Sequence, residues 1–170
     1  MDIRVLEGAL RAEAASAAGS VMVSRGRTHE LERLPGYYAA DMNGNMVGEV
    51  FYHIENRECE IVSLESRREN RGAGTELLGA VVRRARDEGC TRVWLITSND
   101  NTRAIRFYQK RGLDLKAVHR DAITEARKLK LSIPLIGLDG IPIRHELEFE
   151  LILMKGVLPI QAGLAGMPGV

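Results

Sequence analysis

The chain has 170 residues, of which 45% are hydrophobic and 28% are charged, and its formal net charge is +1. This length favours a single domain with room for a hydrophobic core. The balanced charge gives no global field to hold a polyanion, so we expect no nucleic-acid partner. No apolar run approaches the ~20 residues of a membrane span, so we expect no membrane partner either.

The cysteines and the first residues of the sequence favour a cytoplasmic location. Cys59 and Cys90 are too few for a disulfide framework, and no Cys/His spacing resembles a zinc site. We therefore expect reduced thiols and no metal. Residues 1–11 carry several charges and lack the apolar core of a signal peptide. Reduced cysteines suit the cytosol.

The first third of the chain predicts one helix and a segment that is harder to assign. Residues 6–18 are rich in Ala, Leu and Glu and predict a helix that ends at Gly19. After it we expect a short strand, a loop and a short helix, at residues 21–23, 24–27 and 29–34.

Three strands are expected next. Asn43-Gly44-Asn45 is a tight-turn sequence, and a second polar turn follows at residues 55–57. These turns divide the region into the strands of an antiparallel meander, at residues 37–42, 46–54 and 58–66.

The second half predicts alternating helices and strands. Residues 74–88 form the clearest helix, with one apolar face and a stop at Gly89. Residues 92–97 form an apolar run, which indicates a strand that is buried on both faces. We expect a helix, a strand, a short basic helix and a last strand at residues 102–111, 113–118, 122–130 and 146–154. Residues 156–170 are rich in Gly and Pro and predict a loose tail after a single domain of residues 1–155.

The loop at residues 67–74 is suited to binding a phosphate. It leads into a helix, whose first backbone N–H groups are unpaired and carry partial positive charge. Gly72 and Gly74 would let an anion approach that backbone. Three classes of phosphate site compete: a Walker loop, a dinucleotide site and a site for the pyrophosphate of coenzyme A.

The first two classes fit the sequence less well. A Walker loop needs Lys-Ser/Thr where Thr75-Glu76 stands, and a dinucleotide loop needs a third glycine where Leu77 stands. Asp100 does lie about 20 residues further on, where a ribose-binding acid would be expected. The antiparallel hairpins upstream nevertheless argue against a βαβ unit.

Two motifs resemble those of the GCN5-related N-acetyltransferase (GNAT) family, in particular a bacterial subgroup of unassigned substrate. The resemblance covers about residues 37–153. In the phosphate motif, Gly72 and Gly74 match and Glu69 replaces the usual Gln or Arg. The second motif, Asn-x-x-Ala-x-x-x-Tyr followed by a Gly-aromatic pair, is present as Asn101, Ala104, Tyr108 and Gly112-Leu113, with leucine in place of the aromatic residue.

The resemblance implies the α/β GNAT fold, a mixed and mostly antiparallel sheet of six or seven strands with helices on both faces. The first strand would have to lie within residues 3–6 or be missing. Strands 58–66 and 92–97 would splay apart, and the pantetheine of acetyl-CoA would pair with backbone between them. The implied cofactor-binding residues are Val62, Leu64, Glu69, Asn70, Arg71, Gly72, Ala73, Gly74, Thr75, Asn101 and Tyr108.

The implied activity is direct transfer of an acetyl group from acetyl-CoA, as cosubstrate, to a primary amine in a ternary complex. Tyr108 would stabilise or protonate the departing thiolate. Glu65, at the strand end near the acyl group, would take the amine proton, and Glu60 is a weaker candidate. Each has a simpler interpretation: Tyr108 as a core aromatic, Asn101 as a helix cap and Glu65 as an exposed strand carboxylate.

The acceptor remains open as a small-molecule amine or a protein amine, and the protein as a monomer or homodimer. In the family, the acceptor site lies between the connection of the last two strands and the region here at residues 21–35. Arg144 and Glu146, at the end of that connection, are candidates for contacts to the acceptor. Two other functions stay possible: a non-catalytic acyl-CoA-binding regulatory module, against which the presence of Tyr108 argues, and a nucleotide-binding protein.

Overall fold

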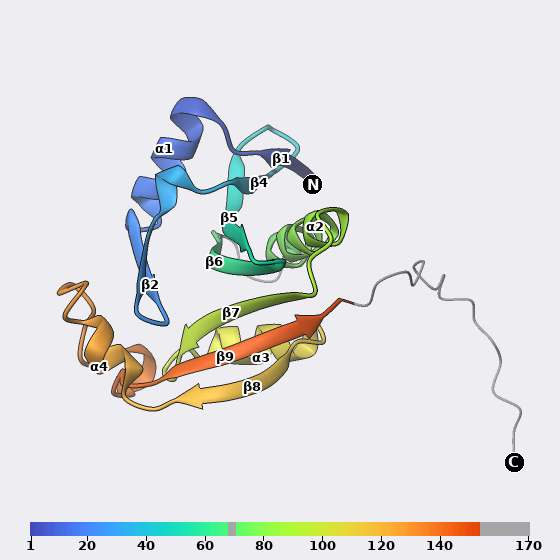
Figure 1. The fold of residues 1–170 in the computed structure, drawn as a ribbon. Helices are drawn as coiled ribbons and strands as arrows, with labels where there is room; N and C mark the ends of the chain where they lie inside the picture. Colours follow the sequence, from blue (N-terminus) through green and yellow to red (C-terminus); the bar gives the residue numbers. More distant parts are fainter. Residues whose placement is uncertain (68–70, 154–170) are drawn as a thin grey trace, which may run out of the picture.

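The computed structural model describes residues 1–67 and 71–153. Its main feature is a seven-stranded sheet with the strand order β1-β4-β5-β6-β7-β9-β8 (Figure 1). Neighbouring strands are antiparallel except β6 and β7, which are parallel. The strands are β1 (Asp2–Val5), β4 (Gly36–Ala40), β5 (Met46–Glu55), β6 (Glu58–Ser66), β7 (Arg92–Ser98), β8 (Asp114–His119) and β9 (Glu146–Ile152). The expected mixed sheet and the β4-β5-β6 meander are confirmed.

A separate hairpin replaces part of the expected loop and short helix after residue 20. Strands β2 (Val21–Ser24) and β3 (Arg27–Glu30) pair with each other, and the one-turn helix η1 (Leu31–Arg33) follows. The helix expected over residues 29–34 is therefore wrong for its first residues. Pairing with β2 satisfies the backbone of β3 and buries His29 beneath the hairpin. β1 supplies the short first strand.

In the described part of the chain, four helices connect the strands, and three of them begin and end close to the expected positions. The helices are α1 (Gly8–Ala17), α2 (Ala73–Asp87), α3 (Thr102–Lys110) and α4 (Ala122–Ala126), with the short turn η2 (Leu138–Gly140) before β9. α4 ends before its expected basic half. The Arg127 side chain there donates hydrogen bonds to the carbonyls of Ile133, Pro134 and Ile143, and these bonds hold the following loop against the end of the helix.

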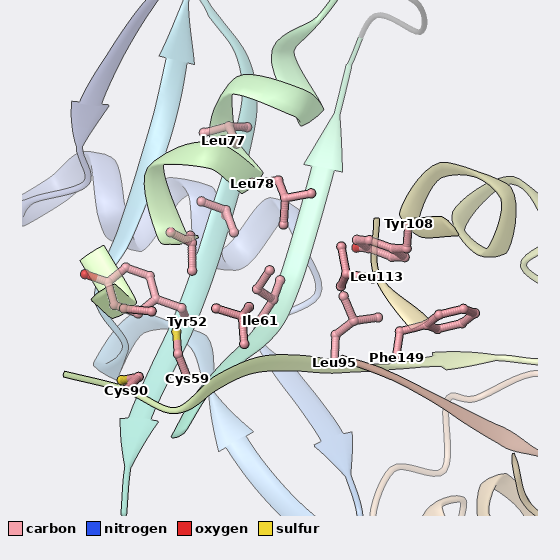
Figure 2. Close-up of a cluster of buried hydrophobic side chains, with 14 of the residues drawn as sticks. Tyr52, Cys59, Ile61, Leu77, Leu78, Cys90, Leu95, Tyr108, Leu113 and Phe149 are labelled. Atoms are coloured by element: carbon pink, nitrogen blue, oxygen red, sulfur yellow. The ribbon is translucent and has the colours of Figure 1, made fainter. Parts of the chain in front are cut away.

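Helices cover both faces of the sheet, as expected. Neighbouring residues of a strand point to opposite faces, and Val50 and Phe51 on β5 belong to two different hydrophobic clusters. The larger cluster lies between the sheet, α2 and α3 (Figure 2), and the smaller one lies beneath α1 and η1. Cys59 and Cys90 are buried free thiols in the larger cluster.

Two expectations about the C-terminal part of the chain concern residues that the structure does not describe. The proposed tail at residues 156–170 lies outside the described residues, as does the last expected residue of the final strand. Within residues 1–67 and 71–153, no helix is long and apolar enough to cross a membrane.

Candidate active site

The central feature of the site is a gap between two parallel strands. β6 and β7 pair only from Glu58 with Arg92 to Ile61 with Leu95. Both strands continue beyond that point, β6 to Ser66 and β7 to Ser98. The pairing of β6 with its other neighbour, β5, is interrupted by a bulge at the same place. Because a bulge bends and twists its strand, it explains why β6 turns away from β7 there.

A cavity of about 310 Å³ occupies this gap. Both splayed strand ends line it, so backbone groups of β6 that would otherwise pair with β7 border open space. The lining includes five residues that the sequence predicted for the site: Val62, Leu64, Glu65, Asn101 and Tyr108. Met22 and Val23 of the hairpin and Lys130 and Ile133 of the connection after α4 complete one wall.

Tyr108 is both a core residue and part of the cavity wall. Its ring makes an edge contact with Phe107 and lies 6.2 Å, between ring centroids, from Phe149. Figure 2 shows it reaching from α3 toward Leu95 and the space between β6 and β7. Burial raises the pKa of the Tyr108 hydroxyl well above its ordinary value. The hydroxyl is therefore a proton or hydrogen-bond donor throughout the neutral range.

Asn101 begins α3 and also borders the cavity. Its side-chain oxygen accepts a hydrogen bond of 3.1 Å from the backbone N–H of Ala104, which makes it a helix cap. The capping interpretation is confirmed, and the same residue lines the gap.

The proposed phosphate cradle lies at the start of α2. Gly72 precedes the helix with φ +82°, and within residues 1–67 and 71–153, its two chain neighbours apart, no atom lies within 4 Å of where its Cβ would be. Ala73 and Gly74 are buried, while Arg71 and Thr75 are exposed. Because Gly72 has no Cβ, it keeps side-chain atoms away from the first helical N–H groups. Glu69 and Asn70 lie outside the described residues.

Gly74 has a packing role that the sequence did not reveal. A Cβ on Gly74 would lie 3.1 Å from the ring of Phe107 on α3, so the glycine lets the two helices approach closely. Arg111, at the end of α3, stacks over the same ring with its guanidinium carbon 3.8 Å from the centroid. Its Nε also donates to the Thr75 hydroxyl at 2.7 Å. Arg111 thus brings a cation to the cradle, although no motif indicated it.

Glu65 is exposed at the rim of the cavity, on the same face of the sheet as Glu49. Glu49 is only 2% exposed, and its carboxylate lies 3.5 Å from the guanidinium of Arg67. Burial raises the pKa of Glu49, Arg67 opposes this shift and Glu65 adds to it. Of the two carboxylates, Glu65 is the one that solvent can reach.

Glu60 sits deeper on the same strand and forms a buried pair with the β2–β3 hairpin. Its Oε2 lies 3.3 Å from Nε2 of His29, and both side chains are almost fully buried. The His29 ring lies 5.5 Å from that of His53, between centroids. The sequence singled out Glu60 as a weaker candidate but gave no reason to connect it with His29.

Three other residues from the sequence analysis have structural partners. Arg144 forms an ion pair with Asp121, and Glu146 is buried and accepts a 3.0 Å hydrogen bond from the backbone of Arg25. Neither lines the cavity, so the expected contacts of these two residues to an acceptor are not supported. Asp100 accepts a hydrogen bond from the backbone of Leu138, which gives it a role in holding η2 rather than in binding a ribose.

Comparison with known proteins identifies the class that this fold and gap define. The model of the acetyltransferase (GNAT) family matches residues 11–113, and the chain belongs to this family. The protein YdhI of Bacillus subtilis (strain 168), described as uncharacterized, is 43% identical over 122 residues, which are 72% of this chain and 76% of that protein.

Two solved structures share the fold. An acetyltransferase of Bacillus subtilis in complex with CoA has a TM-score of 0.70 at 21% identity, over 89% of this chain and 98% of that one. A GNAT family acetyltransferase from Elizabethkingia anophelis with acetyl-CoA bound has a TM-score of 0.63 at 20% identity, over 72% and 78% of the two chains.

Proposed function

We propose that this protein is an N-acetyltransferase that moves the acetyl group of acetyl-CoA directly to a primary amine in a ternary complex. The observation that carries the proposal is the cavity between the splayed ends of β6 and β7, which Tyr108, Asn101 and Glu65 share. Two structural neighbours hold CoA or acetyl-CoA, which supports acetyl-CoA as the cosubstrate.

The described residues fit acetyl-CoA in two places. The unpaired backbone of Val62 and Leu64 on β6 would hydrogen-bond the amides of pantetheine as a missing strand would. The start of α2 would take the pyrophosphate, since helix N-termini attract anions and Gly72 leaves room there. Arg71 and Arg111 would add positive charge at this end of the molecule.

The chemistry needs a neutral amine, a donor to the developing oxyanion and a group that stabilises the thiolate. Most amines are protonated at neutral pH, and Glu65 would take that proton and return it to solvent. A backbone N–H of β6 near Leu64 would donate to the oxyanion. The Tyr108 hydroxyl would donate a hydrogen bond to the departing thiolate. Because its pKa lies above that of a free thiol, this contact acts chiefly as a strong hydrogen bond.

We place this activity in the cytoplasm, since Cys59 and Cys90 are both free and buried and suit a reducing compartment. The acceptor class remains a small-molecule or protein amine under this proposal. A screen of amines for release of the CoA thiol, with mass spectrometry of each product, tests it. Amine-dependent release with an acetylated product is the expected result.

A further inference from the structure

A second cavity adjoins the first beneath the turn of the β2–β3 hairpin. Its volume is about 190 Å³. Residues two apart on a strand share a face, and two such pairs run from the lining of the first cavity to that of the second: Val62 and Glu60 on β6, and Ile96 and Trp94 on β7. The two cavities are therefore neighbours on the hairpin side of the sheet.

Within the described parts of the chain, the second cavity contains buried polar atoms without hydrogen-bond partners. Glu60 is 5% exposed and Ser24 is 7% exposed. Oε1 of Glu60, Oγ of Ser24 and Nε2 of His53 are all buried without a hydrogen bond, and all three residues line the cavity. Nε2 of His53 lies 3.6 Å from the Glu55 carboxylate, beyond hydrogen-bond distance. Buried polar groups in native proteins nearly always have partners, and leaving one unpaired is costly. A ligand with several hydrogen-bond donors would satisfy these atoms.

Most charged side chains around the cavity are paired with one another. On the hairpin, Arg25 pairs with Glu146 and Arg27 pairs with Glu55. Arg92 of β7 pairs with Glu58, Glu148 and Glu150, and Lys116 and His119 of β8 also contact these β9 carboxylates.

Glu60 differs from the other carboxylates of the cavity in its ion pairing. Among the cavity-lining carboxylates of the described chain, it alone has no arginine or lysine partner. Its ion-pair contact is His29, which is charged only when protonated. The cavity therefore holds a buried carboxylate that lacks a permanent positive partner.

An organic ammonium matches this site better than a metal ion. Within residues 1–67 and 71–153, no group of three His, Cys, Asp or Glu side chains is arranged to hold a metal. A primary ammonium has three N–H donors, which equals the number of unsatisfied atoms of Glu60, Ser24 and His53. The Trp94 ring already has the Arg92 guanidinium 5.1 Å from its centroid, so this wall tolerates nearby cations.

We propose that the second cavity binds the distal ammonium of the acetyl acceptor, so that the acceptor is a diamine or polyamine. This inference rests on the proposed acetyltransferase function. The reacting amine would lie at the gap near Ser63 and Leu64, and a strand advances about 3.3 Å per residue. Glu60 is then roughly 10 Å away, a distance that an extended aliphatic diamine spans.

The binding test uses 1,7-diaminoheptane and calorimetry on the full chain, so it does not depend on turnover. Glu60→Gln keeps the size of the side chain and removes its charge, and we expect it to weaken diamine binding about tenfold. Glu55→Gln is the matched control, because Glu55 lines the same cavity but is exposed and paired with Arg27. It should bind the diamine within about twofold of wild type. Ser24→Ala, which removes one acceptor, should weaken binding several-fold and serves if Glu60→Gln does not fold.

The kinetic test compares kcat/KM for 1,7-diaminoheptane and heptylamine. Wild type should prefer the diamine about tenfold, and Glu60→Gln should remove that preference while leaving the heptylamine value nearly unchanged. If wild type, Glu60→Gln and Ser24→Ala all bind the diamine equally, the proposal is wrong. Equal kinetic losses for both amines with a flattened pH profile would also overturn it, since Glu60 would then be the proton acceptor. If neither amine is acetylated, the diamine assignment fails and the wider amine panel decides the proposed function, while calorimetry still decides whether the ammonium site exists.

Discussion

Ile61 and Leu95 are the last residues at which β6 and β7 pair, and the cavity that we propose as the active site opens at that pair. A bulge in the pairing of β5 with β6 coincides with the separation. One local irregularity thus provides both the space for a cosubstrate and the unpaired backbone to bind it.

The first prediction concerns the cradle at the start of α2. Gly72→Ala should weaken CoA binding at least tenfold and reduce the CoA-induced rise in Tm, because a Cβ there would enter the space above the free N–H groups. Gly89→Ala is the matched control, since Gly89 follows the same helix with φ +73° and equally open surroundings. Both substitutions cost about 1 kcal/mol of backbone strain. Equal CoA shifts in the two variants would move the phosphate site away from α2.

The second prediction concerns Tyr108. Tyr108→Phe keeps the ring in the core and should lower kcat roughly 10²-fold with little change in acetyl-CoA affinity. Tyr52→Phe is the control, because Tyr52 is also a buried tyrosine of this cluster but does not line the cavity. Wild-type turnover in Tyr108→Phe, with chemistry shown to be rate-limiting, would remove Tyr108 from the mechanism.

A pH prediction follows from the environment of Tyr108. Burial raises the pKa of its hydroxyl, so the active, protonated form persists as pH rises. The kcat profile should therefore show no loss attributable to this group up to about pH 10, the ordinary tyrosine value. A fall in kcat below that pH that is absent in Tyr108→Phe would contradict the assignment.

The third substitution tests the proton acceptor. Glu65→Gln should lower kcat/KM about 10²-fold and flatten its rise with pH, because the amide cannot accept the amine proton. Glu49→Gln provides the comparison: its carboxylate is buried on the same face but is not part of the cavity lining. If Glu65→Gln keeps the wild-type profile, the proton passes directly to water instead.

Glu49 gives a prediction about stability. Its folded-state pKa is raised, chiefly by burial, from the ordinary value of 4.5. The folded state thus binds the proton more tightly than the unfolded chain, and stability falls as pH rises through this raised pKa. Glu49→Gln should remove this loss and raise the free energy of unfolding at pH 7 by about 1 kcal/mol, the low end of the desolvation penalty for a buried polar group. Urea unfolding of both proteins at pH 4 and pH 7 measures it, and a larger pH-dependent loss in the variant would refute it.

Local sequence patterns predicted most of the strands and helices of this protein. The turn at Asn43-Gly44 and the apolar face of residues 74–88 gave the meander and α2, because both signals depend on neighbours in the sequence. The second motif placed Asn101 and Tyr108, and the structure brings both to one cavity.

The features that sequence reasoning missed depend on contacts between distant segments. The pairing of Glu60 with His29 requires the β2–β3 hairpin to pack on β6, and nothing local to either residue indicates it. The stacking of Arg111 on Phe107 similarly needs α2 and α3 to meet at Gly74. After α4 the backbone continues in turns to Lys130, and the Arg127 side chain binds carbonyls of the following connection, a contact that no local pattern indicates.

The most direct test of the account is the stoichiometry of acetyl transfer. Purified protein, acetyl-CoA and a panel of mono-, di- and polyamines are mixed, and the thiol released and the acetylated amine formed are quantified together. We expect equal amounts of both, release that depends on the amine, and a loss of about 10²-fold in Tyr108→Phe. Saturable acetyl-CoA binding without amine-dependent release, across small-molecule and peptide amines, would contradict the account and identify a non-catalytic acyl-CoA-binding module.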